Sequence, residues 1–331
     1  LAVIGPNAKE AQIIGGGSAS LRPHYQIHPL EALRQRLGHE TEILYSKGCH
    51  THKYLPKINE KLMGDKNGFL VEYFDGNQFY ENLILEERLI GSKFWVFEGF
   101  AKDVISKEGR PNISVKFSCE YRPDISGSHE FEIFGIGQCR LLIDGKELID
   151  NWTSTDPGEA FFTFGSAAKK GVAKFQKGET YKIEVQYYFE GSFPAVYIGC
   201  QPPDEVDIFQ EAIETASNAD EVLLIVGTNS DWETEGNDRA DFNLPANQNK
   251  LIEGILEANQ NTVIVINTGS PVHMPWAKKA NSIVQTWFGG QEFGNALVDI
   301  LSGQVNPSGK LPTTFPAKIE DTPAYKIYPG N

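Results

Sequence analysis

The sequence is poor in sulfur and in positive charge. Its 331 residues include only 4 cysteines and 2 methionines, and no two cysteines form a C-x-x-C pair. We therefore expect free thiols, and neither a disulfide framework nor a zinc site. Lysine and arginine number 30 against 44 acidic residues, a formal net charge of −14. This balance argues against nucleic acids and anionic membranes as partners, because both bind basic surfaces.

Long apolar runs and familiar nucleotide or nucleophile motifs are also missing. No apolar segment approaches the length of about 20 residues that a membrane-spanning helix needs. The stretch IIGGGSAS at 13–20 matches neither G-x-G-x-x-G nor G-x-x-x-x-G-K-[ST], so a nucleotide-binding α/β protein is disfavoured. No G-x-S-x-G occurs. His50 and His52 could act as metal ligands, but the sequence offers no second pair of ligands to complete a site, so we expect no metal. Nothing in the sequence indicates an organic cofactor.

The hydrophobic pattern divides the chain into three regions. Residues 1–66 alternate short apolar strands with an amphipathic helix at 29–38, which starts with proline and ends with glycine. Residues 67–203 alternate aromatic or β-branched residues with polar ones between turn signals, typical of an all-β sandwich. Residues 204–331 return to strands and helices, the first helix carrying Val206 on its apolar face. The simplest account is one α/β sandwich domain with a mostly parallel sheet, interrupted by one β module.

Residues 228–245, TNSDWETEGNDRADFNLP, hold five acidic side chains directly after the buried strand EVLLIVG. Parallel sheets bind ligands at the carboxyl ends of their strands, and every strand of this domain leads into a polar segment that contains glycine. We therefore expect the acid loop to face a ligand. The alternative is a solvated loop. Against it stand Trp232, which is costly to expose, and Asp238 beside Arg239, charges that can fix a loop.

The segments GPNA, GGGSAS, WETEGNDR, NTVIVINTGSPV and NPSGKLPTTFP give the chain a specific likeness. In this order they resemble the second domain of glycoside hydrolase family 3 β-glucosidases. The β region, with YFDG and FGIGQCRLLIDGKELIDNW, resembles the protective-antigen-type module that interrupts this domain in some fungal, yeast-type and bacterial members. The resemblance implies a retaining β-glucosidase whose catalytic barrel, with the nucleophilic aspartate, lies outside this chain. The abrupt ends, LAVIG and YPGN, agree with an internal piece of a longer protein.

The resemblance also implies roles for residues of the acid loop. A retaining glycosidase needs two carboxyl groups about 5 Å apart, one as nucleophile and one as general acid/base. The family motif assigns the acid/base role to Glu235, with Glu233 as the alternative. Because Glu233 and Glu235 are two residues apart, their side chains would both face the site if the loop is extended. Asp238 and Arg239 are then expected to fix the loop, and Trp232 to pack under it or line the site.

Three further residues are expected to contact substrate. Ser18, in GGGSAS, matches a family position that contacts the sugar, and a plain turn serine is the alternative. In FFTFGS we expect a strand with Phe162 and Phe164 on one face and Phe161 on the other. Sugar rings stack on aromatic faces, so Phe164 or Phe162 would contact the aglycone, unless they are core residues of the β module.

The resemblance implies small β-glucosides as substrates, namely cellobiose-like disaccharides and aryl glucosides. Two alternatives stay open: a carbohydrate-binding fragment without catalysis, and a β-xylosidase of the same family, because the missing barrel sets the choice of sugar. Free thiols and the yeast-type likeness favour the cytoplasm over secretion. Oligomers are common among insert-bearing relatives, so the resemblance also implies a homo-oligomer, for which the sequence itself carries no signal.

Overall fold

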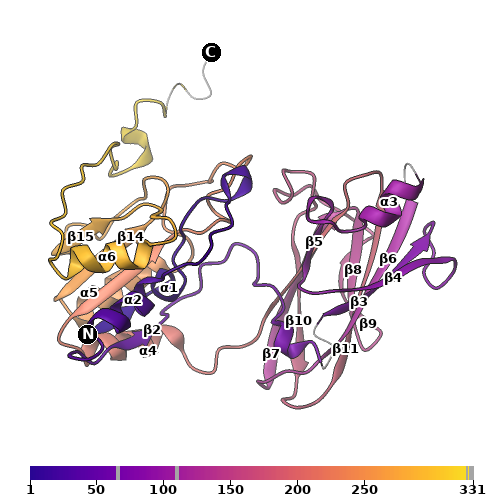
Figure 1. Ribbon diagram of the computed structural model, residues 1–331, viewed down its shortest axis with the longest axis horizontal. Coiled ribbons are helices and arrows are strands. Elements are labelled where there is room, and N and C mark those ends of the chain that lie inside the picture. Colours follow the sequence, from indigo (N-terminus) through magenta and orange to yellow (C-terminus); the bar gives the residue numbers. More distant parts are fainter. Residues whose placement is uncertain (65–67, 109–111, 326, 328–331) are drawn as a thin grey trace. The chain divides into compact units, whose positions relative to one another are not determined.

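The chain folds into two compact units. The computed structural model describes residues 1–64, 68–108, 112–325 and 327. Unit 1 combines Leu1–Lys53 with Val206–Asn331, and unit 2 is Tyr54–Glu205. Figure 1 shows that unit 1 consists of a sheet with helices and unit 2 consists mainly of strands.

Unit 1 is built on a five-stranded parallel sheet with the order β15-β14-β13-β1-β2. Its strands are β1 (Ala2–Ile4), β2 (Leu44–Ser46), β13 (Val222–Gly227), β14 (Thr262–Asn267) and β15 (Ser282–Gln285). Every residue of β13 is buried, because a parallel sheet with helices on both faces leaves its central strands no contact with water. The predicted parallel sheet is confirmed.

Helices cover both faces of this sheet. They are α1 (Pro6–Lys9), α2 (Pro29–Leu37), α4 (Ile208–Ser217), α5 (Gln248–Ala258) and α6 (Phe293–Leu301). Alternate residues of β13 point to opposite faces, so Leu224 packs with α4 and α5, whereas Leu223 packs with α1, α2 and α6 (Figure 1). Two apolar layers therefore enclose the sheet, which makes unit 1 an α/β sandwich as predicted.

The helices of unit 1 follow their sequence signals with one exception. Pro29 opens α2, where its missing N–H is not needed, and Gly38 follows the last helical residue. The carboxylate of Asp207 accepts hydrogen bonds from the N–H groups of Phe209 and Gln210 and so caps α4. Val206 therefore precedes the cap and is exposed. Its predicted place on the apolar face of that helix is wrong.

Unit 2 contains a six-stranded sheet, β4-β3-β6-β11-β8-β9, and a four-stranded sheet, β10-β7-β12-β5, both antiparallel. The strands are β3 (Phe69–Asp75), β4 (Leu83–Leu89), β5 (Lys93–Trp95), β6 (Asn112–Tyr121), β7 (Gly127–Ile136), β8 (Gln138–Ile143), β9 (Lys146–Asn151), β10 (Lys169–Phe175), β11 (Tyr181–Glu190) and β12 (Ala195–Gln201), and the helix α3 (Lys102–Glu108) accompanies them. Phe117 of the larger sheet and Phe131 of the smaller one share a single core. Unit 2 is thus a β sandwich.

The segment FFTF at 161–164 is a turn, and the strand predicted there is wrong. Phe161, Phe162 and Thr163 have φ angles of 53°, 58° and 68°, all left-handed, whereas a strand needs strongly negative φ. Phe161 is 9% exposed and packs against Trp95. Phe162 and Phe164 are 41% and 75% exposed. The two predicted contact residues are therefore surface rings, although Phe162 also lies 5.6 Å from the ring of Trp95.

Candidate active site

The segments that follow β1, β13, β14 and β15 meet at the carboxyl edge of the parallel sheet. The buried side chain of Asn267 joins them. Its Oδ1 accepts from the N–H of Gln12 (2.8 Å) and from Asn7 Nδ2 (3.0 Å), and its Nδ2 donates to the carbonyls of Gln12 (2.9 Å) and Trp287 (2.6 Å). Asn7 also donates to the carbonyl of Thr228 at 3.1 Å. A fully satisfied buried amide holds these loops in one arrangement.

Two glycines, Gly16 and Gly17, allow the segment after β1 to lie directly against the acid loop. The N–H of Gly16 donates to the carbonyl of Glu233 at 2.8 Å. A Cβ on Gly16 would lie 2.4 Å from the carbonyl oxygen of Ser230, and one on Gly17 would lie 2.6 Å from the Cβ of Glu235. Gly17 also has a φ of +69°. The close approach therefore requires glycine at both positions.

Glu235 stands at the tip of a tight turn in the acid loop. Thr234 pairs with Asn237, and Gly236 between them has a φ of 82°. The loop is therefore a turn here and not extended as predicted, although Glu233 and Glu235 both line the same hollow. The exposed carboxylate of Glu235 accepts hydrogen bonds from the hydroxyl of Ser18 and from its N–H, the latter at 3.0 Å. These two bonds hold the pKa of Glu235 below its usual range.

Glu233 lies deeper and has a different set of partners. Its Oε1 accepts from the hydroxyl of Thr228 and from the N–H of Gly269 at 3.0 Å. Arg239 places Nη1 3.7 Å from the same oxygen, with the two side chains 15% and 13% exposed. Arg239 thus fixes the loop through Glu233, whereas the sequence pattern placed Asp238 beside it. Thr228 and Gly269 were not predicted, because neither residue type marks a site by itself.

Trp232 packs under the loop and also borders the site. Its indole N–H donates to the carbonyl of Thr51 at 2.6 Å, and the ammonium group of Lys53 lies 5.7 Å from the ring centre. The ring thereby ties the start of the acid loop to the chain that follows β2. The other side of Trp232 lines the hollow described next.

An open hollow of about 750 Å³ lies between these loops in unit 1. The predicted residues Ser18, Trp232, Glu233, Glu235, Asp238 and Arg239 all line it. Phe242 and Phe288 add apolar surface, and the volume is that of a small-ligand site. Phe162 and Phe164 are not part of this group, since both belong to unit 2.

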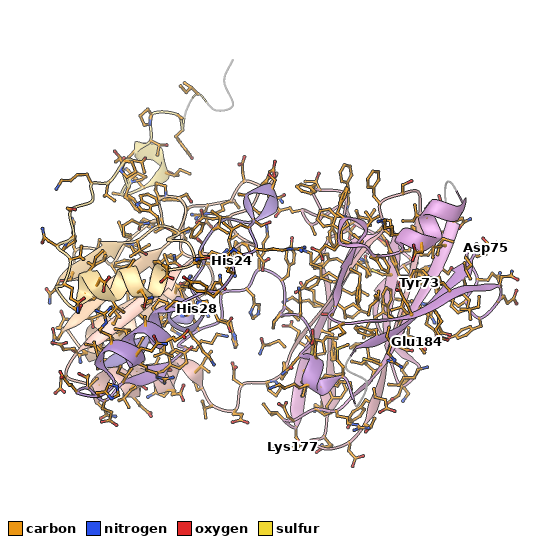
Figure 2. All side chains as sticks on the ribbon, viewed as in Figure 1. His24, His28, Tyr73, Asp75, Lys177 and Glu184 are labelled. Carbon is orange, nitrogen blue, oxygen red and sulfur yellow. The ribbon has the colours of Figure 1, made fainter. Side chains whose placement is uncertain are left out.

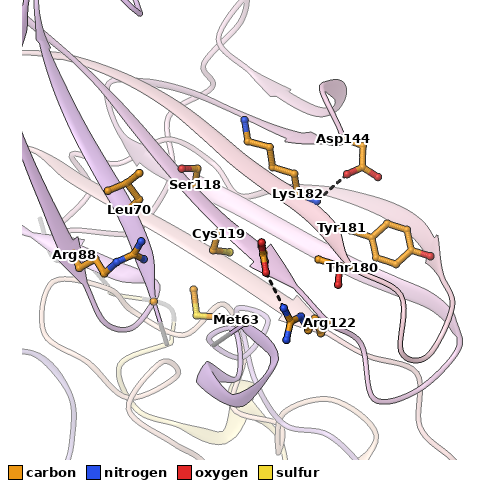
Figure 3. A pocket seen from close by; sticks show the side chains of 13 residues that line it. Met63, Leu70, Arg88, Ser118, Cys119, Arg122, Asp144, Thr180, Tyr181 and Lys182 are labelled. Carbon is orange, nitrogen blue, oxygen red and sulfur yellow. Dashed lines mark hydrogen bonds and ion pairs between the residues drawn. The ribbon is translucent and has the colours of Figure 1, made fainter. Parts of the chain in front are cut away.

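A second hollow, of about 620 Å³, lies in unit 2 (Figure 3). Several of the charged residues that line it have partners nearby. Arg122 pairs with Glu120 at 3.0 Å, and the N–H of Lys182 donates to Asp144 at 2.7 Å. The ammonium group of Lys182 pairs with Glu184 at 2.9 Å. Glu120 and Asp144 are the carboxylates that line this hollow, and both are exposed. None of the site residues expected from the sequence lies among its lining residues.

Histidines and cysteines form no metal centre in the described ranges. Figure 2 places His24 and His28 on the segment that leads into α2. Within residues 1–64, 68–108, 112–325 and 327, no three side chains of His, Cys, Asp or Glu gather closely enough to hold an ion. The same ranges contain no helix with the length and hydrophobicity needed to traverse a bilayer.

A parallel α/β sandwich with an exposed carboxylate beside a small hollow at its carboxyl edge has the arrangement expected of a domain with a small-ligand site. Comparison with known proteins identifies the family. Residues 1–330 match the glycosyl hydrolase family 3 C-terminal domain. The chain belongs to this family.

Relatives of the chain carry β-glucosidase names. It is 37% identical, over 98% of its length, to the probable beta-glucosidase I of Emericella nidulans, and 34% identical, over 100%, to the beta-glucosidase of Rhizobium radiobacter. The crystal structure of the Kluyveromyces marxianus β-glucosidase matches 98% of the chain with a TM-score of 0.83 and 32% identity, and a second structure of that enzyme is a complex with glucose. The chain spans 40% of the length of each of these proteins.

Proposed function

We propose that this chain is the acid/base-bearing part of a longer retaining β-glucosidase, which hydrolyses terminal non-reducing β-D-glucosyl residues. The carrying observation is the carboxylate of Glu235, exposed at the tip of a turn beside a small hollow in a family 3 domain. The nucleophilic aspartate is then supplied by a barrel domain outside this chain. The β-glucosidase names of the relatives support the same activity.

In the proposed reaction, Glu235 protonates the leaving oxygen while the nucleophile attacks the anomeric carbon. It then takes a proton from the water that resolves the glycosyl intermediate. As an acid it must hold a proton near neutral pH, yet the two hydrogen bonds from Ser18 favour its charged form. When Ser18 turns to bond a sugar hydroxyl, Glu235 loses these hydrogen bonds and its pKa rises. The carboxylate of the nucleophile raises the pKa of Glu235 further. Glu235 can then take up the proton that it needs as an acid.

The proposed substrates are small β-glucosides, including cellobiose-like disaccharides and aryl glucosides. Glucose in the Kluyveromyces marxianus structure supports glucose as the reacting sugar. Phe164 and Phe162 are proposed to stack on the aglycone, because both rings are exposed on a turn. Residues 67–203 are proposed to be an inserted protective-antigen-type module within an α/β sandwich formed by 1–66 and 204–331.

The test uses the full-length protein that contains this chain and an aryl β-glucoside with a good leaving group. Glu235→Ala is expected to lower turnover by about 10²–10⁴-fold, the usual contribution of acid/base catalysis. Azide is expected to restore turnover and to give β-glucosyl azide, because this anion attacks the glycosyl intermediate directly and needs no general base to remove a proton. Glu233→Ala is the matched control, and it should give no azide product.

Three outcomes would contradict this proposal. Rescue of Glu233→Ala alone would move the acid/base role by two residues. Full activity in both variants would remove the loop from the mechanism. Faster hydrolysis of the matching aryl β-xyloside would favour the β-xylosidase alternative.

A further inference from the structure

The two glutamates of the acid loop lie in opposite surroundings. Glu235 is exposed at the tip and is held by the flexible hydroxyl and the N–H of Ser18. Glu233 is largely buried, accepts from Thr228 and Gly269, and faces the guanidinium of Arg239. A carboxylate that is enclosed by donors on several sides is poorly placed to exchange protons with a substrate. Its position instead suits a structural connection.

We propose that Glu233 and Arg239 form a latch that positions Glu235 for catalysis. The inference rests on the proposed function, because it needs Glu235 as the acid/base. The two latch residues bracket the turn at its base: Glu233 comes directly before the Thr234–Asn237 pair, and Arg239 follows it. Closing the base of a turn fixes the place of its tip.

The latch also ties the turn to three neighbouring segments. Thr228 lies at the end of β13, and Gly269 lies in the segment after β14. The carbonyl of Glu233 accepts from Gly16, the residue two before Ser18. One residue thereby sets the distance between the carboxyl tip and the serine that contacts it. A displacement of Glu233 moves Glu235 relative to Ser18.

Gly269 gives a way to displace the latch without altering a charge. A Cβ at this position would lie 2.5 Å from Oε2 of Glu233 and 2.6 Å from the ring of Phe288. Its backbone is not in the left-handed region, so alanine adds a contact and no backbone strain. Gly269→Ala is therefore expected to push the Glu233 side chain outward and to reproduce the effect of Glu233→Gln.

The experiment measures kcat and KM of the full-length protein for an aryl β-glucoside. Glu233→Gln and Gly269→Ala are expected to lower kcat by roughly 10²-fold, the effect of misplacing a catalytic group by about 1 Å, with KM unchanged. Glu257→Gln, the same chemical change at an exposed position of α5, is the control and should match the parent. Azide should give no glycosyl azide with either latch variant, because Glu235 is still present.

A double-mutant cycle separates positioning from a loss of stability. Glu233→Gln combined with Arg239→Met is expected to lower kcat no more than the worse single variant, since both changes open one latch. Arg239→Lys should keep more activity than Arg239→Met. Unfolding temperatures of the variants should stay near that of the parent.

Three results would refute the latch, and they can be told apart from a failure of the proposed function. If kcat of Glu233→Gln and Gly269→Ala equals that of Glu257→Gln, no positioning occurs, while azide rescue of Glu235→Ala would still uphold the proposed function. Azide rescue of Glu233→Gln would make Glu233 the acid/base and refute both. If the losses of kcat in the Glu233 and Arg239 variants add up in the double variant and the unfolding temperatures fall, the ion pair only stabilises the fold and does not position Glu235.

Discussion

Replacing Gly17 with alanine is expected to destabilise unit 1 by about 3 kcal/mol. Because the backbone has a φ of +69° here, an alanine would have to adopt a left-handed conformation, which costs about 1–2 kcal/mol. The new atom would also lie 2.6 Å from the Cβ of Glu235, an overpacking that costs about 1–3 kcal/mol. Alanine restricts the unfolded chain, which offsets about 0.4–1 kcal/mol. The net loss exceeds what a surface substitution produces.

The two neighbouring glycines separate these causes. Gly16 has an ordinary φ of −85°, but its Cβ would lie 2.4 Å from the carbonyl oxygen of Ser230, so Gly16→Ala isolates the overpacking of about 1–3 kcal/mol. The Cβ of Gly15→Ala would meet nothing closer than the carbonyl oxygen of Glu233 at 3.5 Å. This control is expected to leave stability unchanged or to raise it by about 0.4–1 kcal/mol.

Urea unfolding of the three variants beside the parent is the assay. The expected order of midpoints is Gly15→Ala at or above the parent, then Gly16→Ala, then Gly17→Ala, with unchanged slopes. Equal midpoints for Gly15→Ala and Gly17→Ala would refute the close packing of this segment against the acid loop. A changed slope would mean that the substitution alters the surface exposed on unfolding and not this contact alone.

Two further predictions concern titration. The hydrogen bonds from Ser18 lower the pKa of Glu235. Their contribution to the free energy of unfolding is therefore fully present at pH values above the usual pKa of a glutamate, and it is lost as the pH falls through the lowered pKa. Ser18→Ala should raise that pKa in an NMR titration of the carboxyl group, and an unchanged value would refute the contact. Burial raises the pKa of Cys49, Cys119, Cys139 and Cys200 to about 12. Iodoacetamide at pH 8 should therefore label none in the folded chain and all four in urea, and rapid labelling of the native chain would contradict their burial.

Much of the architecture could be predicted because it follows from local patterns. The six consecutive residues of β13 are apolar enough to be a buried strand in any context, and Pro29 with Gly38 marks both ends of α2. Strands alternating with helices then require a parallel sheet, whose carboxyl edge gathers the connecting loops. The meeting of Ser18 with the acid loop follows from that topology alone.

The details that escaped prediction depend on contacts between distant segments. Phe161, Phe162 and Thr163 adopt left-handed φ although none of them is a glycine, so their alternating pattern indicated a strand. The pairing of Arg239 with Glu233 was not predicted, because the two residues are separated in sequence and meet only across the turn. Asn267 gave only a faint signal, an asparagine that ends an apolar strand. Its four hydrogen bonds come from segments on both sides of unit 2 in the sequence.

The central place of β1 has a consequence for synthesis. Ala2–Ile4 lies between β13 and β2 in the sheet, so one of its two partners is translated only after all of Tyr54–Glu205. Every strand of unit 2 is complete by then, so this unit can fold on the ribosome before β13 is available to pair with β1. Pairing across so long a stretch of chain is slow to form. Translation that stopped at Glu205 would release a finished β sandwich attached to the apolar strand β1, which could pair with β2 but would lack β13 on its other edge. Such an open apolar edge is prone to aggregate and to be captured by chaperones.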